Sequence, residues 1–222
     1  MREADPDTIH PRAGARWALA WVVLSVPVVV LLLRSPVAGW GAMLGYHVCC
    51  LLASQAVGVE WGRRIRLWEM AAWAAITLIL LGAALQLLPQ VPGLLERATP
   101  SLQRWGLQGG LGVAAFGWYV LVNPWIEEAF WRGSLLGDAF QGLVGRRAAI
   151  WIATLGFVPY HSAVIYLMFG ADAWWFSIPI ALGSAGWVML TRWRRSVVPA
   201  AVSHQMADLV VVLVYLGHSG AA

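Results

Sequence analysis

The chain has 222 residues, of which 60% are hydrophobic and only 12% are charged. Soluble domains of this size carry about 25% charged residues, so the composition excludes an ordinary soluble globular protein. The formal charge of +4 comes from arginine, since the chain contains no lysine, and the arginines lie in short clusters between apolar runs. We interpret these clusters as signals of membrane topology and expect no nucleic-acid partner.

Seven hydrophobic segments follow a polar N-terminal head, residues 1–16, for which we expect no fixed structure. Each segment is near the roughly 20 residues that a helix needs to cross a bilayer. The sequence therefore predicts an all-α, polytopic transmembrane helix bundle with about seven spans, in a range of roughly six to eight. The segments are Trp17–Leu33, Trp40–Val59, Leu67–Leu88, a fourth that begins at Leu111, Ala148–Phe169, Trp174–Leu190 and Val197–Leu216.

Two stretches depart from this simple pattern. Residues 89–106 hold three prolines and are predicted to form an external loop that closes an N-terminal part, residues 17–106. Residues 107–222 form the second part. Within it, residues 111–143 would make about 50 Å of helix, which is more than one bilayer needs. A break or kink is therefore predicted at Pro124.

The arginines predict the orientation of the bundle. With a cytoplasmic N-terminus and seven crossings, 12 of the 15 arginines belong to the cytoplasmic side, as the positive-inside rule requires. The three that fall on the other side are Arg34, Arg97 and Arg104.

Two adjacent carboxylates, Glu127 and Glu128, lie in the middle of an apolar stretch. A charged side chain at the centre of a bilayer costs about 2.5–3.5 kcal/mol on the insertion scale, so such residues are rare and usually functional. On a helix, Arg132 shares a face with Glu128 four residues before it, whereas Glu127 points about 100° away. The pattern predicts that Glu128 pairs with Arg132 and that Glu127 is free to face another group.

Further ionisable residues lie in the later apolar runs. Counted from a turn at residues 143–147, Glu128 and His161 would each lie about 24 Å along their helices. Asp208 would lie about 20 Å from the same side, one helical turn after His204. Three separate helices can thus bring glutamate, histidine and aspartate side chains to a similar depth, and we predict that they converge.

Each of these groups also has an interpretation without chemistry. The carboxylate pair can form a structural ion pair with Arg132, and a single buried histidine such as His161 is often held by a core hydrogen bond. His204 and Asp208 can be a helix-stabilising i,i+4 pair. His47 has no acidic residue near it in the sequence and is interpreted as structural.

Three motifs in the second part resemble those of one family when they are taken together and in order. The patterns E-E-x-x-x-R, F-x-x-x-H and H-x-x-x-D/N are similar to the CPBP family of intramembrane proteases, which includes CAAX prenyl endopeptidases and bacteriocin-processing or immunity-type homologues. The resemblance covers about residues 110–216, and the first three spans show no motif of the family. The matching residues are Glu127, Glu128, Trp131, Arg132, Gly133, Phe157, His161, His204 and Asp208.

The resemblance implies a role for each residue in peptide hydrolysis. Glu127 and His161 would hold and activate a water molecule. His204 and Asp208 would stabilise the oxyanion, and an aspartate can donate a hydrogen bond to it only when protonated. Glu128, paired with Arg132, would keep Glu127 in place.

Metal dependence is the open alternative. Glu127, His161 and His204 also form a thermolysin-like ligand set for zinc, although the H-E-x-x-H spacing is absent and the three ligands would come from three helices. From the chemistry of the site we favour a metal-free mechanism with no cofactor, and zinc remains the alternative.

The sequence as a whole predicts an intramembrane endopeptidase in a prokaryotic inner or plasma membrane. Its expected partners are the lipid bilayer and a membrane-embedded or lipid-anchored protein or peptide, cleaved near its tail. A narrower alternative is a C-terminal sorting-tail protease of the myxosortase kind. Alternatives from other classes are a proton-coupled transporter, for which we find no internal inverted repeat, and a non-enzymatic immunity or scaffold homologue.

Overall fold

The structure is a computed structural model that describes residues 11–34, 38–85, 94–107 and 109–218. Within these ranges every regular element is a helix, and a single β-bridge joins Gly62 to Ser196. The predicted all-α class is therefore confirmed. The elements are α1 (Pro11–Leu33), α2 (Ala38–Val57), α3 (Leu67–Leu85), α4 (Leu94–Arg104), α5 (Gly109–Leu121), α6 (Asn123–Glu128), the π-helix η2 (Ala129–Ser134), α7 (Asp138–Val144), α8 (Arg146–Leu155), α9 (Phe157–Phe169), the 3₁₀-helix η3 (Ala171–Phe176), α10 (Ser177–Arg194) and α11 (Val198–His218).

Five helical segments among the described residues are long and apolar enough to cross a membrane. A sixth span is possible if α4 and the α5–η2 segment, which meet at a bend of 105°, form one broken span. Helix α3 is apolar over the shorter range Leu67–Gly82. The chain is an integral membrane protein with a polytopic helix bundle, and the count of seven spans stays a prediction.

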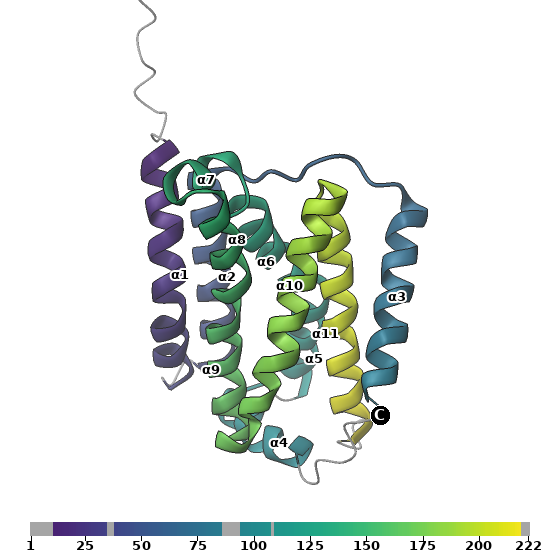
Figure 1. Cartoon of the computed structure of the whole chain (residues 1–222). Coiled ribbons are helices and arrows are strands. Elements are labelled where there is room, and N and C mark those ends of the chain that lie inside the picture. Colours follow the sequence, from purple (N-terminus) through teal and green to yellow (C-terminus); the bar gives the residue numbers. More distant parts are fainter. Residues whose placement is uncertain (1–10, 35–37, 86–93, 108, 219–222) are drawn as a thin grey trace, which may run out of the picture.

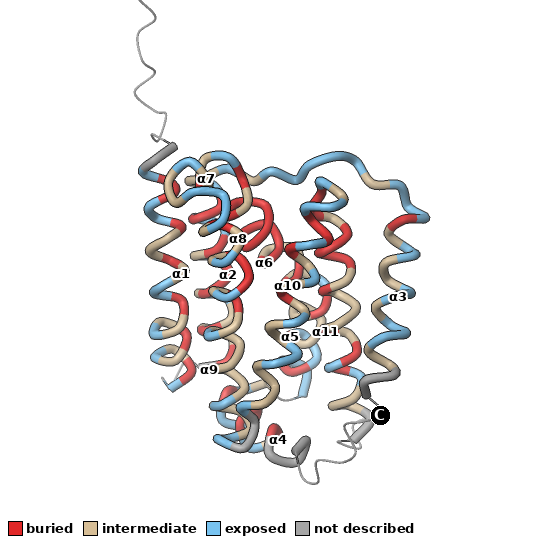
Figure 2. Tube along the Cα trace, in the orientation of Figure 1, coloured by how far each residue is buried: buried red, intermediate tan, exposed pale blue. Residues whose placement is uncertain are grey.

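The carboxylate-bearing segment lies in the middle of the bundle. Helix α6 contacts α2, α5 and α11, and η2 contacts α2 and α10 (Figure 1). Helices α1 and α2 pack as a pair at one side, and α3 stands at the other side against α11. Buried residues gather on the sides of the helices that face this centre, which places α6 and η2 in the core (Figure 2).

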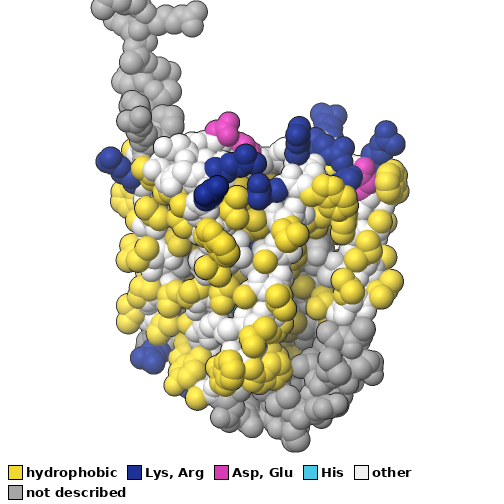
Figure 3. Space-filling model, viewed as in Figure 1, with side chains coloured by type: hydrophobic (Ala, Val, Ile, Leu, Met, Phe, Trp, Pro, Cys, Tyr) yellow, Lys and Arg dark blue, Asp and Glu magenta, His cyan; other side chains and the backbone are white. Residues whose placement is uncertain are grey.

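Charge is concentrated at one end of the molecule. Figure 3 shows arginine side chains along the upper end, above a broad belt of hydrophobic side chains. The segments at that end are the loop after α2, the start of α8 and the end of α10, which carry most of the described arginines. Exposed apolar side chains on the helices, such as Val113 at 72% exposure and Leu182 at 69%, suit contact with lipid tails.

The loop between α2 and α3 closes the arginine-rich end. The backbone amide of Glu60 donates to Gly133 in η2 at 3.1 Å, and the amide of Val197 donates to the carbonyl of Trp61 at 3.1 Å. A side chain at Gly133 would meet Val59, with its Cβ only 2.6 Å from a methyl carbon of that residue. The glycine therefore lets the loop pack directly onto the segment that carries the carboxylates.

The structure adds detail at the ends of two elements. Residues 94–104 of the predicted external loop form helix α4, which packs against α9, and residues 89–93 lie outside the described residues; the external position of the segment stays a prediction. Residues 11–16 belong to α1 instead of an unstructured head, whereas residues 1–10 lie outside the described residues.

The predicted interruption near Pro124 is present. Helix α5 ends at Leu121, and Pro124 lies in the first turn of α6, where a missing backbone N–H costs nothing. The helical stretch then ends at Ser134, and α7 is a separate short helix at the arginine-rich end (Figure 1). Residues 111–143 therefore comprise the α5–η2 segment, interrupted near Pro124, and the separate helix α7. The break after Ser134 removes the length in excess of one bilayer.

Candidate active site

The two carboxylates lie at the junction between α6 and η2. Both side chains are fully buried, and so is the whole π-helical turn that follows them. The wider turn is fixed by a backbone bond from Leu135 to Phe130, at 3.2 Å. Such π-turns interrupt an α-helix at some cost and occur frequently at functional sites.

Arg132 partners Glu128, as its spacing predicts. Its Nη1 donates to Glu128 Oε1 at 2.9 Å, and both side chains have no solvent exposure. Its Nη2 donates to the hydroxyl of Ser184 on α10 at 2.8 Å, and that hydroxyl donates to the carbonyl of Thr154 on α8 at 2.8 Å. The guanidinium thus joins the carboxylate to two further helices.

Aromatic rings enclose this ion pair. The guanidinium carbon of Arg132 lies 4.7 Å from the ring centroid of Phe157 and 5.4 Å from that of Trp187. Trp187 in turn stacks on the imidazole of His204, with ring centroids 4.1 Å apart. A planar guanidinium stacks well on aromatic faces, so these rings hold both Arg132 and His204 in a fixed orientation.

His161 presents one ring nitrogen to Glu127. Its Nδ1 lies 2.9 Å from the backbone carbonyl of Phe157, which can only accept, so Nδ1 carries the proton. In the neutral ring the lone pair is then on Nε2, which lies 3.6 Å from Glu127 Oε2. That separation is too long for a direct hydrogen bond, but one water molecule can contact both atoms.

His204 lies between three carboxylates. Its Nδ1 is 3.0 Å from Glu128 Oε1. Its Nε2 is 3.7 Å from Glu127 Oε2 and 3.7 Å from Asp208 Oδ1. The imidazole of His204 therefore lies between the carboxylates of Glu128 and Glu127.

The structure thus brings all the predicted site residues to one place, although the depth predicted for Glu128 was wrong. The helix with the carboxylates ends at Ser134 and not at residues 143–147, so Glu128 lies only about 9 Å of helix from the arginine-rich end. His204, six residues into its own helix from Val198, also lies about 9 Å from that end.

The carboxylate of Glu127 is fully buried, and neither of its oxygens has a hydrogen-bond partner among the described residues. Buried polar groups normally have partners, and an exception calls for an explanation such as a bound water or a catalytic role. The two facing imidazole nitrogens place this carboxylate where a reacting water or a substrate group would supply the missing bonds.

A second group of polar side chains lies beside Asp208; the sequence analysis interpreted one member, His47, as structural and missed its partners. Asn123 at the start of α6 donates to Asp208 Oδ2 at 3.1 Å, and it contacts His47 of α2 at 2.6 Å. Trp118 of α5 donates to the other ring nitrogen of His47 at 3.1 Å. An ionisable or amide side chain within an apolar run is the signal that could have indicated them.

The donor set comes close to the geometry of a zinc site. Within the described part of the chain, no group of three His, Cys, Asp or Glu side chains is already arranged as a metal site. Two ligands about 2.0–2.2 Å from a tetrahedral zinc ion lie about 3.3–3.5 Å apart. Glu127 Oε2 lies 3.6 and 3.7 Å from the histidine nitrogens, close to that span, so the mechanism without metal stays a prediction.

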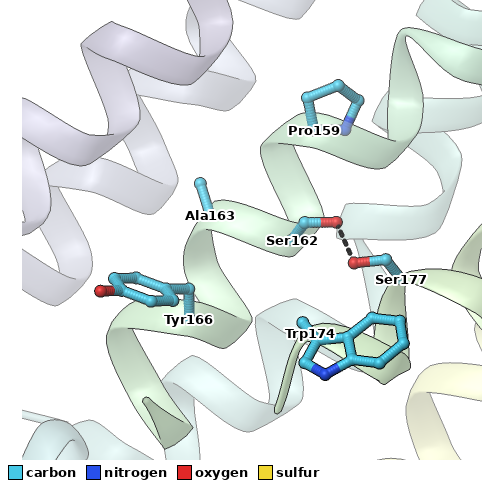
Figure 4. A pocket seen from close by; sticks show the side chains of 6 residues that line it. All are labelled: Pro159, Ser162, Ala163, Tyr166, Trp174 and Ser177. Carbon is cyan, nitrogen blue, oxygen red and sulfur yellow. Dashed lines mark hydrogen bonds between the residues drawn. The ribbon is translucent and has the colours of Figure 1, made fainter. Parts of the chain in front are cut away.

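A separate hollow opens on the other side of α9 (Figure 4). It has a volume of about 290 Å³, and a hydrogen bond of 2.7 Å joins Ser162 to Ser177 across it. The residues that α9 contributes are spaced as one helical face, and His161 lies on a different face. The hollow is therefore distinct from the carboxylate–histidine cluster. Its lining residues are Pro159, Ser162, Ala163, Tyr166, Trp174 and Ser177.

A carboxylate that faces two imidazoles inside a helical membrane bundle has the acid–base groups of a membrane-embedded hydrolase. Residues 109–210 match the model of a family described as type II CAAX prenyl endopeptidase Rce1-like. The match to this CAAX protease family over that segment supports an intramembrane endopeptidase of this general type, acting on a membrane-associated protein. Searches for similar curated proteins and for similar solved structures found no match.

Proposed function

We propose that the chain cleaves a membrane-anchored protein or peptide near its tail with a water molecule activated by Glu127 and His161. The observation that carries the proposal is the position of Glu127. Its carboxylate is fully buried, has no hydrogen-bond partner among the described residues, and faces the Nε2 atoms of His161 and His204 at 3.6 and 3.7 Å.

The first step is attack by water on the scissile carbonyl. The water donates one proton to Glu127, its other hydrogen contacts His161 Nε2, and its oxygen forms a bond to the carbonyl carbon. The carbonyl oxygen becomes an oxyanion. His204, with Nδ1 bound to Glu128, presents Nε2 to the cluster, and in its protonated form this nitrogen donates to the oxyanion.

The second step is collapse of the tetrahedral intermediate. The C–N bond breaks, and Glu127 returns its proton to the leaving amine, so that the carboxylate is regenerated. Glu128 and Arg132 take no part in proton transfer. Their ion pair of 2.9 Å, tied to Ser184, keeps His204 and the neighbouring Glu127 in position.

The position of the site supports the proposed substrate class. The cluster lies inside the bundle, and His161 is its most accessible member, with 18% of its side chain exposed against 0% for Glu127. A peptide that already lies in or on the bilayer can reach such a site without leaving the membrane. Candidate substrates are a lipid-modified tail, as in the CAAX proteins, and an unmodified C-terminal sorting tail.

The proposed location is a prokaryotic plasma membrane with the N-terminus in the cytoplasm. The arginine clusters at the end formed by the loop after α2 and by the α10–α11 turn support this orientation (Figure 3). The active site would then lie in the cytoplasmic half of the bilayer.

The test is cleavage of two defined peptides by protein in proteoliposomes. One is a farnesylated peptide that ends in a CAAX sequence, and the other is an unmodified single-span peptide with a short C-terminal tail. Mass spectrometry of the products identifies the cleaved bond for the wild type and for Glu127→Ala. Cleavage that depends on Glu127 supports the proposal, and the preferred peptide names the substrate class. If wild type and variant release the same products at the same rate, the proposal is wrong.

A further inference from the structure

A series of hydrogen bonds, all pointing the same way, runs from Trp118 on α5 through His47 on α2 to the active site. Trp118 Nε1 donates to His47 Nδ1 at 3.1 Å, and His47 Nε2 lies 2.6 Å from Asn123 Oδ1. Asn123 Nδ2 lies 3.1 Å from Asp208 Oδ2. Asp208 Oδ1 then faces His204 Nε2. Four helices, α2, α5, α6 and α11, each contribute a member.

The direction of the chain follows from the chemistry of its first member. An indole N–H can only donate, so Nδ1 of His47 must be an acceptor without a proton. His47 is then neutral and carries its proton on Nε2, which donates to the Asn123 carbonyl oxygen. The amide nitrogen of Asn123 is thereby turned toward Asp208, and an amide rotated by 180° would break both bonds.

Burial strengthens the hydrogen bonds that orient Asp208. His47, Asn123 and Asp208 are 2%, 3% and 5% exposed, so water competes little for their hydrogen bonds. The Oδ2 atom of Asp208 is held as an acceptor by the Asn123 amide at 3.1 Å. Oδ1 is left to face His204.

We propose that His47 and Asn123 are positioning residues that orient Asp208, and through it His204, for the hydrolysis proposed above. His47 acts from α2, outside the segment 109–210 that matches the protease family. The N-terminal spans carry no motif of the family, but one of their residues, His47, thus contributes to the active site. The inference rests on the proposed function for its catalytic consequence and on the hydrogen bonds alone for its geometry.

The kinetic test is a double-mutant cycle with the peptide that the wild type cleaves. His47→Leu removes the donor and should lower kcat about tenfold with little change in KM. His47→Gln offers an amide N–H to Asn123 and an oxygen to Trp118, and should stay within about threefold of the wild type. In an Asp208→Ala background the effect of His47→Leu should disappear, because coupled residues are not additive.

A matched control separates positioning from general damage to α2. Cys50 lies on the same helix, is buried, and accepts a hydrogen bond from Trp21 at 3.3 Å; among the described residues no hydrogen bond joins it to His47, Asn123 or Asp208. Cys50→Ala should therefore leave kcat unchanged. Equal losses in Cys50→Ala and His47→Leu, or a His47→Leu loss of the same size in both backgrounds, would overturn the positioning role.

A second measurement does not depend on activity. Nitrogen NMR of protein labelled with ¹⁵N at histidine, with His47 assigned from the His47→Gln spectrum, should show a neutral ring with a proton on Nε2 and none on Nδ1. A proton on Nδ1 would refute the chain of hydrogen bonds. If the wild type cleaves no faster than Glu127→Ala, the proposed function and the catalytic consequence fall together, and this spectrum still decides the geometry.

Discussion

Replacement of Arg132 by methionine tests the buried ion pair at the centre of the bundle. Methionine has an unbranched chain that can fill much of the same space between Phe157 and Trp187, so packing changes less than charge does. The change leaves Glu128 fully buried without its cation and removes the donors to Ser184.

The expected cost follows from that geometry. Both side chains of the pair have 0% exposure, and loss of one partner from a buried pair costs about 3–5 kcal/mol because the other charge stays buried. Adding Glu128→Gln removes the stranded charge, while the amide oxygen can still accept from His204. The double variant should therefore recover more than half of the loss.

The assay is the free energy of unfolding in mixed micelles, titrated with SDS and followed by tryptophan fluorescence. Arg192→Met is the control, since this arginine is exposed at the end of α10 and its loss should cost less than about 0.5 kcal/mol. A cost below about 1 kcal/mol for Arg132→Met, or a double variant no more stable than the single one, would refute the reasoning.

Three further predictions concern chemistry and topology. Asp208→Asn should keep most activity, because an amide oxygen can still accept from Asn123, whereas Asp208→Ala should lose at least about tenfold in rate, or roughly 1.4 kcal/mol; if Asn is as damaging as Ala, a charged His204–Asp208 pair is required. EDTA or phenanthroline should leave activity intact, and activity that is lost and then restored by zinc would replace the proposed mechanism by a metal-dependent one. Reporter fusions at the two termini should report opposite sides of the membrane, with the N-terminus inside, and a result on the same side would contradict seven spans.

Helical periodicity was enough to predict the central contacts. Glu128 and Arg132 are four residues apart, and their contact survives the change from α- to π-helix between them. The order of the motifs along the chain and their apolar surroundings were enough to identify His161 and His204 as candidate active-site residues. The depth predicted for Glu128 was wrong because the boundary at Gly137 and Asp138 was not recognised, so the turn was placed one short helix too late.

The partners of His47 could not be predicted in the same way. Its hydrogen bonds go to Asn123 and Trp118, which are more than 70 residues away on other helices. Spacing identifies neighbours on one helix, whereas contacts between helices depend on how the bundle packs. The same limit applies to Ser184, whose hydroxyl supports Arg132 from α10 and gives no signal in the sequence.

The most direct test of the central claim is the turnover of purified wild type and Glu127→Gln on the same peptide in proteoliposomes. Glutamine keeps the shape of the side chain and cannot take a proton from water, so the account predicts a fall in kcat of at least about 100-fold. Unfolding measurements should show that the variant is as stable as the wild type, because a buried charge is removed. A folded Glu127→Gln protein that cleaves within about twofold of the wild-type rate would contradict the account.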